Sequence, residues 1–78
     1  MDQTLFLGLD LGSCWSKAVV IDGSRQIVGR ALRRTGIRFE EAAEALRAEA
    51  LEAAGADASQ LAGTVATGIN YTAWIAKK

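Results

Sequence analysis

Two apolar runs separated by a short polar interruption constrain this chain more than any other feature. The interruption lies within LGLDLGSCWSKAVVID, residues 7–22. Before it, residues 4–10 are almost continuously apolar, which predicts a strand covered on both faces. After it, residues 16–22 are rich in β-branched side chains and predict a second strand. The five residues between them, 11–15, suit a hairpin, so the chain is expected to open with two antiparallel strands.

Two further strands are expected after this hairpin. Asp22 and Gly23 predict a turn, because glycine adopts a positive φ without a steric penalty. Residues 26–33 mix arginines with apolar residues, which is typical of an edge strand. Residues 61–67 (LAGTVAT) predict a fourth strand, whereas residues 68–78 are ambiguous among a helix, a strand and a frayed end.

A helix is expected between the third and fourth strands. Glutamates crowd its first turns, which places negative charge at the positive end of the helix dipole. Thr35 is a candidate N-cap and Gly55 a candidate C-terminal stop. Apolar residues at spacings of three and four predict one buried face, made of Phe39, Ala42, Ala43, Leu46, Ala50, Ala53 and Ala54.

The predicted fold class is α/β, in the order β-β-β-α-β. Three strands form an antiparallel meander, the helix crosses one face of the sheet, and the fourth strand runs parallel to the first. Residues 1–78 are enough for one small domain and no more. A single helix covers only one sheet face, whereas the first two strands read as buried on both. This mismatch predicts a single partial domain that further chain or a partner completes.

Composition narrows the class of protein. Apolar residues make up 50% of the chain, which favours a folded core over intrinsic disorder. Nine basic and nine acidic residues cancel, so we expect no nucleic-acid partner. The apolar runs are far shorter than the roughly 20 residues of a transmembrane helix, so no membrane partner is expected. Cys14 is the only cysteine, which excludes an internal disulfide; with no signal peptide, it predicts a cytoplasmic protein.

The interruption carries residue types that bind phosphate. Gly12 allows a tight turn and a close approach of an anion to backbone N–H groups. Ser13 and Ser16 add hydroxyl donors, and Lys17 adds a compact positive charge. Asp10 ends the first strand with a carboxylate of the kind that Mg²⁺ or its bound waters need. The plain alternative is an ordinary turn, because these residue types are common in turns and the loop lacks the Walker A spacing.

The same stretch, the Asp-Gly turn and VATGIN at residues 65–70 resemble one group of ATPases. The superfamily is that of actin, the heat-shock chaperones and the sugar kinases, whose domains have a ribonuclease H-like fold. Within it the chain looks most like the BadF/BadG/BcrA/BcrD ATPase family, the activators of 2-hydroxyacyl-CoA dehydratases and benzoyl-CoA reductases. The resemblance covers residues 5–70, most densely near the start, and implies an N-terminal fragment of an actin-like ATPase.

This resemblance implies roles for the hairpin residues. In that family the loop contacts the β- and γ-phosphates of ATP, and an aspartate at the position of Asp10 helps to organise Mg²⁺ through water. Asp10 is therefore the expected catalytic and metal-organising residue. The expected ATP phosphate-binding residues are Gly12, Ser13, Cys14, Ser16 and Lys17.

Two departures from the family pattern matter. Cys14 and Trp15 stand where the family usually has serine or threonine, so one or two hydroxyl contacts are lost while the backbone donors survive. After Gly68 the chain continues with Ile69 rather than with the tyrosine, glycine and arginine common in the family. Family activators also bind a [4Fe–4S] cluster between two identical subunits. Such a cluster is bound by about four thiolates. Because the chain's one cysteine lies in the loop, no cluster ligand is expected here.

Three functions stay open at this point. The first is the ATP-binding portion of an activator that couples ATP hydrolysis to electron transfer into a dehydratase or reductase, acting as a homodimer. The second is the N-terminal piece of a sugar or glycerol kinase. The third is a non-catalytic, truncated remnant that acts only in assembly. Because a second phosphate loop, an adenine pocket and cluster ligands are missing, we do not expect these 78 residues to turn over ATP efficiently alone.

Overall fold

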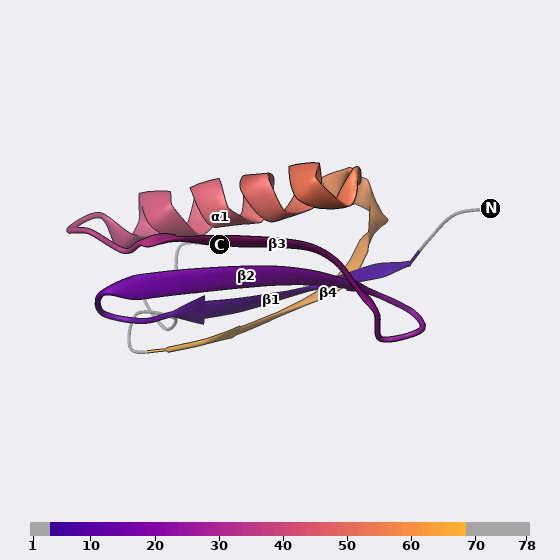
Figure 1. Ribbon diagram of the computed structural model, residues 1–78, viewed down its shortest axis with the longest axis horizontal. Helices are drawn as coiled ribbons and strands as arrows, with labels where there is room; N and C mark the ends of the chain where they lie inside the picture. Colours follow the sequence, from indigo (N-terminus) through magenta and orange to yellow (C-terminus); the bar gives the residue numbers. More distant parts are fainter. Residues whose placement is uncertain (1–3, 69–78) are drawn as a thin grey trace.

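The two apolar runs form the central pair of a four-stranded sheet. In the computed structural model, which describes residues 4–68, β1 (Leu5–Leu11) and β2 (Trp15–Asp22) lie side by side in the strand order β3-β2-β1-β4 (Figure 1). The edge strands of this sheet are β3 (Ile27–Arg34) and β4 (Leu61–Thr67). The helix α1 (Phe39–Ala54) and a short 3₁₀ turn, η1 (Ala58–Gln60), connect them.

The topology confirms the predicted α/β order. β1 pairs with β2 and β2 with β3 in antiparallel fashion, whereas β1 pairs with β4 in parallel. The loop between β1 and β2 is shorter than expected, because Leu11 and Trp15 extend the two strands and leave only residues 12–14 outside them. The expected third strand is likewise shifted by one residue, since Arg34 still pairs with Trp15. Residues 69–78, for which the sequence allowed several structures, lie outside the described residues.

The core lies between α1 and one face of the sheet. Figure 1 shows α1 running along that face, with no described element on the opposite face. The burial of β1 alternates accordingly, with Leu5, Leu7, Leu9 and Leu11 buried and Phe6 exposed. The expectation that β1 is covered on both faces is therefore not met within residues 4–68. We call the face away from α1 the open face; the strand pairing places on it, among others, Phe6, Asp10, Lys17, Leu32 and Val65.

The C-terminal end of α1 is as predicted, whereas its N-terminal end differs. Gly55 adopts a left-handed conformation (φ 65°) and closes α1 as predicted, with its N–H donating to the carbonyl of Glu52. Arg38, not Thr35, occupies the N-cap position, and its side chain makes no capping bond. On the buried face, Leu51 takes the place expected for Ala53. Two residues apart corresponds to about 200° around a helix, so these two side chains lie on opposite sides.

The turn between β2 and β3 depends on a side chain rather than on its glycine. The Asp22 carboxylate accepts hydrogen bonds from the backbone N–H groups of Ser24 (2.8 Å) and Gln26 (3.0 Å). The positive φ lies at Arg25 (65°), not at Gly23 as expected. Aspartate stabilises such turns by accepting bonds from the backbone that follows it. Among the described residues, no helix combines the length and the apolar character that a membrane crossing requires.

Candidate functional site

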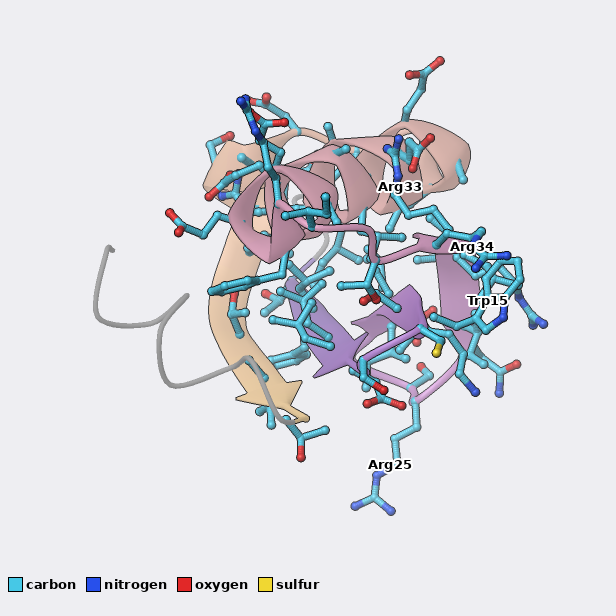
Figure 2. The ribbon with its side chains drawn as sticks, turned by 90° about the vertical axis from the view of Figure 1, so that its left-hand side faces the viewer. Trp15, Arg25, Arg33 and Arg34 are labelled. Atoms are coloured by element: carbon cyan, nitrogen blue, oxygen red, sulfur yellow. The ribbon has the colours of Figure 1, made fainter. Side chains whose placement is uncertain are left out.

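The candidate site lies where three strands end together. β1 and β4 run in parallel and β3 runs antiparallel to β2, so the C-terminal ends of these three strands meet at the β1–β2 loop. In sheets with crossover helices, ligands bind at the C-terminal ends of the strands. Figure 2 views the molecule from this end, and its labels place Trp15 and Arg34 side by side.

Asp10 and Lys17 face each other across the last part of the hairpin. They are register partners in the β1–β2 pair, and both side chains are exposed on the open face. Within residues 4–68, neither side chain makes a hydrogen bond or an ion pair. A hollow of about 320 Å³ lies beside them, lined by Gly8, Leu9, Asp10, Lys17, Ala18, Val19, Val65 and Thr67.

The loop itself requires glycine at its first position. A Cβ atom added to Gly12 would lie 2.5 Å from the carbonyl oxygen of Trp15, a backbone atom that cannot swing away as a flexible side chain can. Ser13 and Cys14 follow in the loop, and both are exposed. The structure therefore brings Asp10, Gly12, Ser13, Cys14 and Lys17 to one end of the sheet, as the hairpin pattern predicts.

Ser16, the other expected phosphate-binding residue, lies on the α1 side of the sheet. Its side chain is fully buried (0% exposed), and its hydroxyl lies 2.6 Å from that of Thr35. The Thr35 hydroxyl in turn donates to the carbonyl oxygen of Gly12 (2.7 Å), and the Thr35 N–H donates to the carbonyl of Cys14 (2.8 Å). Ser16 is thus linked to the inner side of the loop through Thr35.

Thr35 is the residue that sequence reasoning missed at this site. Its place shortly before α1 makes it a candidate helix N-cap in the sequence, and nothing local points to the loop. The signal that could have identified it is the strand register. Since Trp15 pairs with Arg34, the last residue of β3, the residue that follows β3 lies opposite Cys14.

A cation–π contact flanks the loop on its β3 side. The Arg34 guanidinium lies 5.5 Å from the centre of the Trp15 ring. Trp15 is 51% exposed. Arg34 and Trp15 are cross-strand partners, so the register brings the two side chains together. Such contacts contribute about 0.5–1 kcal/mol at exposed sites. In Figure 2, Arg33 points toward α1 instead, and Arg25 points away from both.

A second, larger hollow of about 580 Å³ lies at the junction of β3 and α1. Two of its arginines are paired with glutamates of α1: Arg33 with Glu49 (3.5 Å) and Arg38 with Glu41 (3.0 Å). Exposed pairs of this kind contribute little to stability, about 0–1 kcal/mol. None of the expected phosphate-binding residues lines this hollow, whose walls are formed by Arg33, Arg34, Thr35, Gly36, Ile37, Arg38, Glu41, Ala42 and Ala45.

The side chains of the candidate site fit Mg²⁺ but not a [4Fe–4S] cluster, the two inorganic groups that the family resemblance implies. Within residues 4–68, no three acidic, cysteine or histidine side chains gather as a metal site. Mg²⁺ does not need such a cage, because it is commonly held by one or two carboxylates, waters and substrate phosphates, and the exposed Asp10 can supply one carboxylate. A [4Fe–4S] cluster does not fit: Cys14 is exposed in the loop and is the chain's one cysteine.

Among solved structures, the chain is similar to component A of the (R)-2-hydroxyglutaryl-CoA dehydratase from Acidaminococcus fermentans. The TM-score is 0.80 and the identity is 29%, over 94% of this chain and 28% of that protein. The chain thus spans little more than a quarter of the length of this relative. No family model and no curated protein matches the sequence. The similarity confirms the resemblance to the dehydratase activators and the partial actin-like fold.

Proposed function

We propose that this chain is the ATP-binding portion of an activator ATPase that couples ATP hydrolysis to electron transfer into a 2-hydroxyacyl-CoA dehydratase or a benzoyl-CoA reductase. The observation that carries the assignment is the hairpin, which brings a carboxylate, an ammonium group and a glycine loop together at the ends of the strands. The similarity in fold to component A of such a dehydratase supports it.

Each hairpin residue has a distinct role in this assignment. The loop at Gly12, Ser13 and Cys14 holds the phosphate oxygens through backbone N–H groups and the Ser13 hydroxyl. Lys17 places a positive charge beside the phosphates. Asp10 orients the waters of a bound Mg²⁺, which neutralises phosphate charge when present. The described residues thus bind and orient the phosphates.

Binding, rather than turnover, is the activity we assign to these residues. They hold one phosphate loop and no cluster ligand, and the matched part of the chain covers 28% of component A. Hydrolysis and electron transfer, a partner dehydratase or reductase, a second copy of the chain and a cytoplasmic location are parts of the proposed function of the whole activator.

Calorimetric titration of Mg-ATP into the wild-type chain and the Asp10→Asn variant tests the assignment. We expect the wild-type chain to release heat of binding, and the variant to bind about tenfold or more weakly because it lacks the charge that organises Mg²⁺. Glu52→Gln is the matched control, since it removes one exposed carboxylate from α1 and is expected to bind like wild type. Equal heats for Asp10→Asn and wild type, or no heat from either, would contradict the assignment.

The assembly alternative has one observation in its favour. The open face exposes the large apolar side chains Phe6, Leu32 and Val65, which a partner surface could cover. If neither the wild-type chain nor the Asp10→Asn variant binds Mg-ATP, the result favours this alternative over ATP binding. No observation in residues 4–68 favours the kinase alternative over the activator.

A further inference from the structure

Two buried hydroxyls form a directed chain beneath the loop. Thr35 donates its single hydroxyl proton to the carbonyl of Gly12, so the 2.6 Å bond between the two side chains must be donated by Ser16. Ser16 and Thr35 are the two buried polar side chains among residues 4–68, with 0% and 4% of their surface exposed. The next buried β2 positions on this face are apolar, Ala18 and Val20. The polar pair is thus confined to the position under the loop.

The bonds from Thr35 determine which way the loop amides point. Its hydroxyl holds the carbonyl oxygen of Gly12, and its backbone N–H holds that of Cys14. No peptide bond among the described residues is cis. In a planar trans peptide, the N–H points opposite to the carbonyl of the preceding residue. The N–H groups of Ser13 and Trp15 are therefore directed away from Thr35.

We infer that Thr35 is a positioning residue for phosphate binding. By holding the carbonyls of Gly12 and Cys14 inward, it turns the N–H groups of Ser13 and Trp15 outward as donors for an anion. Ser16 acts through Thr35, because its hydroxyl fixes the orientation of the Thr35 hydroxyl. The inference rests on the proposed function, in which this loop binds the phosphates of ATP.

A substitution series at Thr35 separates the contribution of its hydroxyl from those of its branched shape and its backbone hydrogen bond. Thr35→Val removes the hydroxyl but keeps the branched shape and the N–H donor to Cys14, whereas Thr35→Ser keeps the hydroxyl. Thr64→Val, at an exposed position of β4, is the matched control. Two quantities are measured for each protein: the NMR order parameters of the Ser13 and Trp15 amides in the free chain, and the Mg-ATP affinity by calorimetry.

We expect Thr35→Val to loosen the loop while the sheet stays folded. The order parameters of the loop amides should fall from about 0.85 to below about 0.6. The Mg-ATP affinity should fall about tenfold or more, since small misplacements of binding groups weaken an oriented contact. Thr35→Ser and Thr64→Val should match wild type in both quantities. Unchanged order parameters, or an unchanged affinity, in Thr35→Val would overturn the inference.

The two measurements also separate this inference from the proposed function. If wild type fails to bind Mg-ATP, the proposed function fails, and the order parameters alone still decide whether Thr35 holds the loop. If Thr35→Val does not fold, Ser16→Ala and Thr35→Ser replace it, with loosening expected in Ser16→Ala only. Equal loop order in those two variants would overturn the inference.

Discussion

At the scale of single residues, the candidate site depends on where backbone groups approach one another. Gly12 lies so close to the Trp15 carbonyl that no side chain fits there, while Thr35 binds the carbonyls on either side of Ser13. The close approach of Gly12 to Trp15 therefore joins the two ends of the loop, and the bonds from Thr35 hold its inner side. The side chains of Ser13 and Cys14, between these fixed points, are exposed.

A substitution at Gly12 tests this steric requirement. We expect Gly12→Ala to lower the free energy of unfolding by about 1–3 kcal/mol, because the added methyl group overlaps the Trp15 carbonyl and the backbone must shift. Urea denaturation measures the effect. The control is Gly23→Ala, where an added Cβ meets no atom within 4 Å. A loss for Gly23→Ala as large as that for Gly12→Ala would show that the close approach at residue 12 is not the cause.

At the scale of elements, periodicity and composition predicted the type and order of the strands and the helix. These features depend on local patterns, such as the spacing of Ala43, Leu46 and Ala50 on α1. What the sequence could not provide is the bond between Thr35 and Gly12, which joins residues 23 positions apart. A threonine four residues before a helix reads locally as a cap. Only the pairing of β2 with β3 shows that its side chain is used by the loop.

The packing of α1 on β3 depends on another close approach. A Cβ atom added to Gly29 would overlap the backbone of Ala50 and Ala54, so α1 rests directly on this strand. We expect Gly29→Ala to move the helix outward and to cost about 1–3 kcal/mol of unfolding free energy. Thermal unfolding followed by circular dichroism measures it. Gly63→Ala is the control, because its nearest contact, with the Phe6 ring, is an ordinary 3.8 Å. A cost for Gly29→Ala no larger than for Gly63→Ala would rule out this packing.

At the scale of the whole molecule, the two faces of the sheet differ in kind. α1 covers one face with an apolar core, whereas the open face combines apolar side chains with the charged side chains of Asp10 and Lys17. The apolar run of β1 predicted cover on both faces, and within residues 4–68 only one is covered. The site therefore lies at the edge of an apolar surface, where the hollow beside Asp10 is lined by Val19 and Val65.

The open face should bind an apolar dye through its exposed side chains. Leu32 is 61% and Val65 is 74% exposed, so Leu32→Ser/Val65→Ser is expected to lower the fluorescence of bound anilinonaphthalene sulfonate. Each of these exposed changes should alter the unfolding free energy by no more than about 0.5 kcal/mol. Ile37→Ser is the control, because Ile37 is 98% exposed but lies between β3 and α1, outside the sheet. If Ile37→Ser lowers the fluorescence as much as the double variant, the dye does not report on the open face. If instead the double variant alone lowers it, the dye binds the exposed apolar surface of the open face beside the candidate site.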